Sequence, residues 1–150
     1  MSSSEFGRRI TLGNLLFECA SKYGSRPFLT IVESGTSISY INFERHVNRL
    51  AHGLQSRFGN RDQYVAIMLE NCLEYLALSY ALKITRQVEV SVKCAFRGPA
   101  LSRMINLTKS SLLVSSAAHF DAFSEIVDDL PLVRTLVVLD DANRASTLFP

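Results

Sequence analysis

Histidine and cysteine are the side chains that most often bind metals or act as catalysts, and this chain has three of each. They are His46, His52, His119, Cys19, Cys72 and Cys94. His46 and His52 lie six residues apart on one predicted helix, so they point in different directions and cannot share a metal. The cysteines form no CxxC pair and no local Cys/His cluster, which disfavours zinc and redox motifs. His119 has no chemical partner nearby in the sequence, and we expect each of the three histidines to be a surface or half-buried residue rather than a catalyst.

Carboxylates and serines give no catalytic pattern either. Glu70 and Glu74 stand one helical turn apart, as a carboxylate pair could, but the electrostatics of a helix start explain them better. No serine lies in a G-x-S-x-G elbow. We interpret Ser110–Ser111 and Ser115–Ser116, which bracket a predicted strand, as turn and cap residues.

A nucleotide-binding loop would need glycines that let backbone amides approach phosphate. Neither G-x-G-x-x-G nor G-x-x-x-x-G-K-[ST] occurs in the chain. The segment 34–37, SGTS, looks like a phosphate loop but has one glycine and no nearby lysine, so a hairpin turn explains it better. We therefore expect no catalytic, cofactor-binding or metal-binding residue in this chain.

Helical and strand patterns alternate along the chain and define the elements that would position any site. Helical spacing covers 11–23, 42–58, 71–81, 101–108 and 120–127, and strand patterns cover 28–32, 37–40, 64–69, 88–92, 112–115 and 135–139. This order predicts an α/β fold: a mostly parallel sheet flanked by helices, with an N-terminal β-hairpin. We expect one domain over 11–140 and an irregular tail over 141–150. Ligands in such sheets usually sit at the carboxyl ends of the strands, which here lead into residues 70–71, 93–98 and 117–119.

The composition excludes several functional classes. The chain has 150 residues, a formal net charge of +2, 47% hydrophobic residues and 20% charged residues, which is typical of a globular domain. So small a charge indicates no nucleic-acid partner. The most apolar stretch, 64–84, contains Glu70, Glu74 and Lys83, so we expect no membrane span. An odd number of cysteines and the lack of a secretory segment favour the cytoplasm.

Three segments resemble the N-terminal subdomain of the adenylate-forming (AMP-binding) acyl-CoA synthetases. They are ISYINFERHVNRLAHGLQSRFGNRDQYVAIML at 38–69, YVAIMLENCLEYLALSYALKI at 64–84 and QVEVSVKCAFRGPALSRMINLTKSSLLVSS at 87–116. The run LLVSSAAHFDAF at 112–123 is most similar to ligases of the carnitine/crotonobetaine kind. The resemblance implies ATP-dependent activation of a carboxylic acid to an acyl-adenylate, then to an acyl-CoA, with ATP, Mg²⁺ and CoA as cofactors of the parent enzyme. Fatty acid metabolism is its expected setting, and the acyl substrate is not specified.

The chain departs from the family pattern in two ways. The family usually has glycine where Thr85 and Arg86 stand, and a left-handed turn at Arg86 would be strained. The phosphate loop with its lysine, the adenine and ribose motifs, the hinge and the C-terminal lysine match no position here, so no functional residue carries over. We expect a truncated synthetase that binds no cofactor and is inactive alone, with a full-length synthetase or the missing C-terminal part as partner. A non-catalytic α/β interaction or small-molecule-binding module is the alternative.

Overall fold

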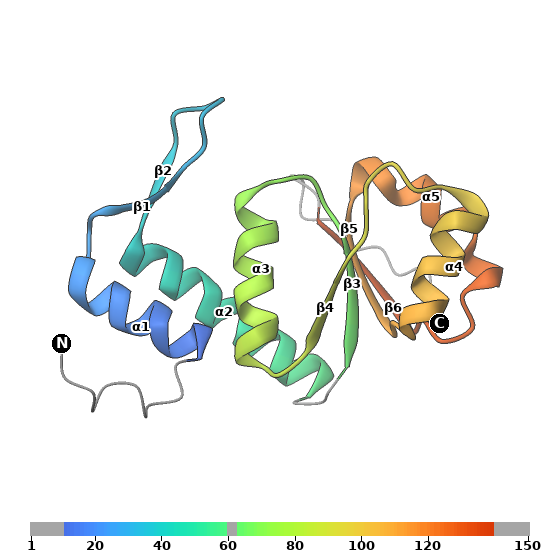
Figure 1. Ribbon diagram of the computed structural model, residues 1–150, viewed down its shortest axis with the longest axis horizontal. Coiled ribbons are helices and arrows are strands. Elements are labelled where there is room, and N and C mark those ends of the chain that lie inside the picture. The colour runs from blue at the N-terminus through green and yellow to red at the C-terminus, as the bar shows by residue number, and fades with distance from the viewer. Residues whose placement is uncertain (1–10, 60–62, 140–150) are drawn as a thin grey trace, which may run out of the picture.

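The N-terminal part consists of two helices joined by a β-hairpin, in a computed structural model that describes residues 11–59 and 63–139 (Figure 1). Helix α1 (Leu12–Tyr23) begins at Thr11, whose side chain accepts a hydrogen bond from the backbone N–H of Asn14. Strands β1 (Pro27–Thr30) and β2 (Ser37–Ser39) pair antiparallel, which confirms the predicted hairpin. Helix α2 (Tyr40–Phe58) follows directly.

A four-stranded parallel sheet forms the centre of the molecule, in the order β4-β3-β5-β6. Its strands are β3 (Tyr64–Met68), β4 (Val88–Ser91), β5 (Leu112–Ser116) and β6 (Thr135–Leu139). In β3 the last four residues are buried, as predicted for a central strand covered on both faces. The alternation of strands and helices therefore gives the predicted α/β fold with a parallel sheet.

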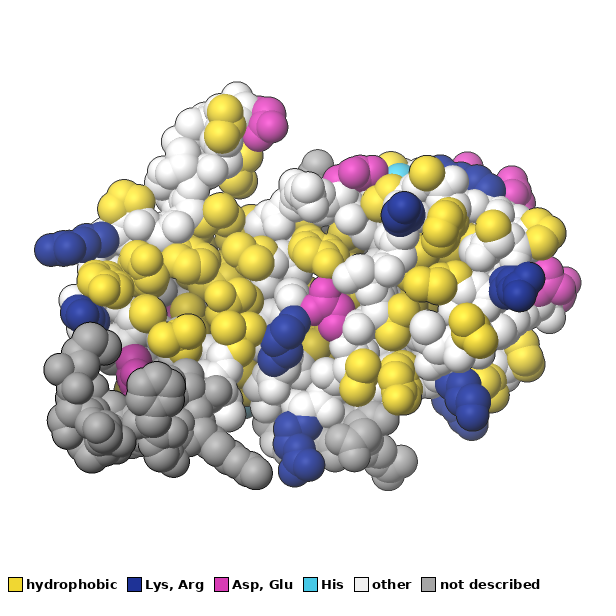
Figure 2. All heavy atoms as spheres, in the orientation of Figure 1, with side chains coloured by type: hydrophobic (Ala, Val, Ile, Leu, Met, Phe, Trp, Pro, Cys, Tyr) yellow, Lys and Arg dark blue, Asp and Glu magenta, His cyan; other side chains and the backbone are white. Residues whose placement is uncertain are grey.

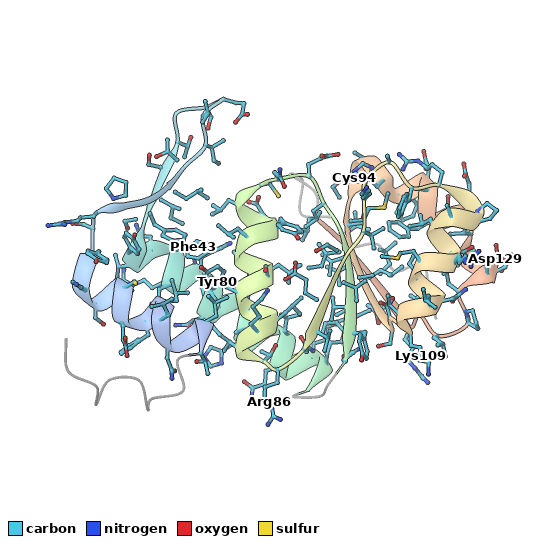
Figure 3. All side chains as sticks on the ribbon, viewed as in Figure 1. Phe43, Tyr80, Arg86, Cys94, Lys109 and Asp129 are labelled. Carbon is cyan, nitrogen blue, oxygen red and sulfur yellow. The ribbon has the colours of Figure 1, made fainter. Side chains whose placement is uncertain are left out.

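Helices cover both faces of the sheet and create two separate hydrophobic cores (Figure 1). One core joins α1, α2 and α3 (Leu73–Ile84) to alternate residues of β3 and β5, and Phe43 lies at its centre with no exposed surface. The Phe43 ring stacks on Phe28 at 4.5 Å between centroids and meets the edge of Tyr80 at 5.4 Å (Figure 3). The other core joins α4 (Gly98–Thr108) and α5 (Phe120–Ser124) to the opposite sheet face around Phe123.

Two helix predictions were wrong in detail. Helix α3 is capped by Cys72 rather than Asn71: Cys72 has the extended backbone of a cap, and its Sγ accepts from the Tyr75 N–H at 3.4 Å. The helical stretch predicted over 120–127 is broken, because α5 ends at Ser124 and two 3₁₀ turns, Ala117–His119 and Val127–Asp129, flank it. These turns leave Ile126 buried in the second core on the way to β6.

The irregular tail expected over 141–150, together with Asp140, lies outside the described residues. Among residues 11–59 and 63–139, no helix combines the length and apolar character needed to cross a membrane.

Candidate functional site at the carboxyl edge of the sheet

The loops that leave β3, β4 and β5 meet at one edge of the sheet. The register pairs Ile67 of β3 with Ser91 of β4, and Met68 of β3 with Ser115 of β5, so the three strands end side by side. Glu70 follows β3, Cys94 follows β4 and His119 follows β5. Figure 3 labels Cys94 at this edge.

Glu70, Cys94 and His119 form a compact cluster of polar side-chain atoms. One carboxylate oxygen, the thiol sulfur and one ring nitrogen all lie within 4.8 Å of one another. The Nε2 atom of His119 is 3.6 Å from Oε1 of Glu70. The His119 side chain is 11% exposed and that of Glu70 is 77% exposed, so His119 forms the enclosed inner side of the cluster and Glu70 its open rim toward solvent.

The histidine of this cluster has unsatisfied polar atoms. Both His119 ring nitrogens are inaccessible to solvent and have no hydrogen-bond partner among the described residues. Buried polar groups are almost always paired in folded proteins, because an unpaired one loses its hydration without compensation. His119 differs from the other described side chains of this kind in that both of its polar atoms, rather than one, are left without a hydrogen bond.

The cluster also disfavours a charged thiol. Burial raises the pKa of Cys94, and the hydrogen bond and negative charge of Glu70 raise it further, while Arg97 opposes them. Cys72, at the start of α3, likewise has a pKa raised chiefly by burial, which the Tyr75 N–H partly offsets. Neither thiol is activated as a nucleophile by these surroundings.

Arg97 fixes the loop that carries Cys94. Its Nη1 donates to the carbonyl oxygens of Cys94 at 2.6 Å and Phe96 at 2.7 Å. Gly98 then adopts φ +48°, a left-handed conformation that glycine tolerates, and α4 begins. The Arg97 guanidinium thus stabilises the conformation of the loop between β4 and α4.

The sequence placed these three loops at the carboxyl edge but did not bring their side chains together. His119 has no chemical partner nearby in the sequence, but in space it lies close to Glu70 and Cys94, which follow separate strands 49 and 25 residues earlier in the numbering. A search for local Cys/His spacing does not detect ligands distributed over three βα loops. The available signal was that one potential metal ligand follows each of three consecutive parallel strands.

A second polar cluster joins the edge strand β4 to α3. Glu89 accepts hydrogen bonds from Ser79 at 2.6 Å, Lys83 at 2.6 Å and Tyr75 at 2.9 Å. Burial alone would raise the pKa of Glu89, but these bonds, led by Lys83, outweigh it and lower the pKa to about 2. Because every strong partner lies on α3 or β4, this network is structural: it holds the edge strand to its helix.

The other histidines do not form a site together. His46 lines a shallow groove on α2 with Asn42, Arg45 and Arg49, and its Nε2 is buried without a hydrogen-bond partner among the described residues. His52 is exposed. The predicted separation of these two histidines along α2 is consistent with this difference in surroundings.

The serines have structural roles, but not all of the predicted ones. Ser115 and Ser116 lie within β5, and Ser116, which precedes the 3₁₀ turn at Ala117–His119, makes no side-chain cap hydrogen bond, so the cap prediction was wrong there. Residues 34–37 form the hairpin turn: the Gly35 N–H donates to Ile31 at 2.8 Å, and Gly35 has φ +67°. Ser111 accepts from the Gln63 amide at 2.7 Å, and Ser115 donates to the Met68 carbonyl at 3.1 Å.

The fold defines a class of protein: a three-layer α/β unit with a parallel sheet, an N-terminal helix pair and a hairpin. The family model of the AMP-binding enzymes matches residues 16–149, and the chain belongs to that family.

Several proteins similar to this chain are named as CoA ligases or CoA synthetases. The chain is 23% identical over 113 residues to the 3-oxocholest-4-en-26-oate–CoA ligase of Rhodococcus rhodochrous, covering 75% of this chain and 20% of that protein. The structure of a long-chain-fatty-acid–CoA ligase from Archaeoglobus fulgidus superposes with a TM-score of 0.82 at 17% identity, over 88% of this chain and 28% of the other. A Mycobacterium tuberculosis fatty acyl CoA synthetase gives 0.80 at 17% identity, over 86% and 26%. This chain thus spans about a fifth of the length of its curated relative and has the fold of the corresponding part of these enzymes.

Proposed function

We propose that this chain supplies the N-terminal part of an acid–CoA ligase that uses ATP to form an acyl-adenylate and then an acyl-CoA. The observation that carries the proposal is the match of the AMP-binding family over 16–149. The curated relative, itself named as a CoA ligase, supports the same reaction class. We infer that residues 11–140 act as one structural unit of that enzyme, in the cytoplasm.

The chain alone is proposed to be inactive. The polar network around Glu89 is used to hold β4 to α3. The family's phosphate loop matches no segment of the 150 residues. ATP, Mg²⁺ and CoA are therefore assigned to residues that a longer parent enzyme provides, and this unit serves as their scaffold.

A finer proposal concerns the acid that the parent enzyme activates, and it rests on one segment of the chain. Residues 112–123 resemble carnitine/crotonobetaine ligases, whereas the Rhodococcus relative is named for a sterol-derived acid. A chimera in which residues 11–139 replace the equivalent segment of the Rhodococcus ligase would be assayed with crotonobetaine, a long-chain fatty acid and the sterol acid. Preference for crotonobetaine supports the finer proposal, and an unchanged sterol-acid preference contradicts it.

Pyrophosphate exchange tests the main proposal. The purified 150-residue chain should give none with any carboxylic acid, while the chimera should give CoA-thioester formation above that of the ligase lacking its N-terminal segment. A chimera carrying Phe43→Ala is the matched control, because Phe43 is completely buried and its loss should strongly destabilise the unit without touching a reactive group. Exchange by the isolated chain, or a chimera no better than the Phe43→Ala control, would overturn the proposal.

A non-catalytic interaction module is the second candidate, and exposed apolar side chains favour it. Leu15 and Phe17 on α1 are 44% and 63% exposed, and Ile84 on α3 is 38% exposed. Figure 2 shows hydrophobic side chains gathered over this side of the molecule. If this surface binds a full-length synthetase, Phe17→Ser should abolish co-purification with that enzyme, and unchanged co-purification would reject the surface.

A further inference from the structure

We propose that Glu70, Cys94 and His119 bind a zinc-like divalent transition metal at the carboxyl edge of the sheet. The ligand set is one carboxylate oxygen, one thiol sulfur and one imidazole nitrogen, contributed by the loops after β3, β4 and β5. Zn²⁺ accepts this mixture of oxygen, sulfur and nitrogen ligands. Mg²⁺ and Ca²⁺, which require oxygen ligands, do not.

The distances suit a tetrahedral ion. Zinc bonds of about 2.0–2.3 Å place a nitrogen and an oxygen ligand roughly 3.3 Å apart. His119 Nε2 and Glu70 Oε1 are already 3.6 Å apart, and all three ligand atoms lie within 4.8 Å. The exposed Glu70 side chain can close the remaining gap by changing rotamer, whereas the half-buried His119 has little room to move.

The state of His119 is an independent reason to place a ligand here. Its ring nitrogens are buried and unpartnered among the described residues, although its side chain borders an open rim. A metal bound to Nε2 would satisfy the atom that faces Glu70. The exposed carboxylate also leaves an entry path for the ion and room for water in the fourth coordination position.

Cys72 is excluded from the proposed ligand set by its role in the fold. Its Sγ accepts the Tyr75 N–H at 3.4 Å and caps α3. A serine at this position would provide the same cap. Cys72→Ser is therefore a matched control for Cys94→Ser, since both remove one thiol and keep a hydroxyl.

The site would tie three strand ends together. Because a metal that binds the folded chain in preference to the unfolded chain stabilises it by mass action, Zn²⁺ should raise the melting temperature in a concentration-dependent way. Mg²⁺ at the same concentration should not. The Mg²⁺ measurement also distinguishes this site from the Mg²⁺-dependent use of ATP proposed for the parent enzyme, because failure of one does not imply failure of the other.

The test is titration of the full 150-residue chain with Zn²⁺ against a competing chelator, and with Co²⁺ followed by thiolate-to-cobalt charge-transfer absorption. We expect one ion per chain. Changing a group that supports a metal ligand lowers metal affinity by up to about 100-fold. Cys94→Ser and His119→Gln remove a ligand itself, so each should weaken Zn²⁺ binding by at least about 100-fold. Glu70→Gln should weaken it by about 10-fold, because an amide oxygen still coordinates. Cys72→Ser and His52→Gln should bind as the parent chain does.

Circular dichroism of every variant would show that it is folded before its affinity is compared. Absence of stoichiometric Zn²⁺ binding by the folded parent chain would overturn the site. So would a charge-transfer band that survives Cys94→Ser and is lost in Cys72→Ser, or competition by Mg²⁺ at equal concentration. A folded His119→Gln variant with unchanged affinity would likewise reject it.

Discussion

Replacing Arg86 with glycine should stabilise the protein, because Arg86 occupies a backbone conformation that suits glycine. Arg86 follows the C-cap of α3 with φ +61°. The Gln87 N–H donates to the Leu82 carbonyl at 2.8 Å, and the Arg86 N–H donates to Lys83 at 3.4 Å. These two bonds form the Schellman helix ending, in which the left-handed residue is usually glycine.

The size of the effect is the difference between two terms. A residue with a Cβ atom in the left-handed region costs about 1–2 kcal/mol. Glycine loses more freedom on folding, which offsets about 0.5–1 kcal/mol of the gain. The exposed Arg86 side chain makes no hydrogen bond or ion pair with the described residues, so little else is lost. We expect Arg86→Gly to raise the free energy of unfolding by about 0.5–1 kcal/mol and the melting temperature by about 1–4 °C.

Thermal and urea unfolding followed by circular dichroism measure this change. Arg86→Ala is the matched control: it removes the same side chain but keeps the Cβ atom, and it should give no comparable gain. If Arg86→Ala stabilises the chain as much as Arg86→Gly does, the arginine side chain rather than its backbone is unfavourable. A loss of stability in Arg86→Gly would refute the backbone argument directly.

Three further predictions concern the Glu89 network, the hydrophobic core and the N-cap of α3. Glu89→Gln should lower the free energy of unfolding by about 1 kcal/mol at pH 7, a small figure because Lys83 is 43% exposed. Since the pKa of Glu89 in the folded chain is lowered to about 2, the stability difference between variant and parent in urea unfolding should be complete above pH 4.5 and fade as the pH falls toward 2. A stability difference that does not change with pH would contradict this prediction. Phe43→Ala should cost about 3–5 kcal/mol of unfolding free energy, whereas the exposed Phe17→Ala should cost less than 1, and equal losses in urea melts would contradict the core assignment. Cys72→Ser should keep or slightly raise the melting temperature, because serine is a preferred N-cap, and a loss of several degrees would show that the thiol does more than cap α3.

Most of the fold was readable because local patterns and tertiary packing agree. The helical spacing over 42–58 predicts one apolar stripe made of Phe43, Val47, Leu50, Leu54 and Phe58. Phe43, Val47 and Leu54 are buried, and Leu50 and Phe58 are half-buried against the same core. The unbroken apolar run of β3 predicted a strand with helices on both sides, as found. The left-handed turn expected at Arg86 is present, because this residue has φ +61°.

The candidate metal cluster was not readable, for a geometric reason. Its three residues follow three different strands, so their proximity depends on the strand order β4-β3-β5, which places β3 between its two neighbours. The sequence predicted that the loops share an edge, but not which loops are adjacent. The cap of α3 shows the same limit at short range, because Asn71 and Cys72 can both accept the hydrogen bond and the loop decides between them.

The left-handed backbone residues and the candidate metal ligands lie at opposite ends of the strands, so their effects on stability and on metal binding can be separated. The two left-handed residues other than glycine in the described chain, Arg86 and Lys109, end α3 and α4 just before β4 and β5 begin. Figure 3 shows Arg86 and Lys109 at the end of the sheet away from Cys94. Backbone strain in enzymes often marks a functional site, but here it stands where helices turn back into strands, while the polar groups gather where strands end. The double variant Arg86→Gly/Lys109→Gly should therefore be more stable than the parent chain and bind Zn²⁺ with unchanged affinity. Changing a group that supports a metal ligand lowers metal affinity by about 10-fold or more. A loss of that size in the double variant would show that the two ends of the sheet are coupled.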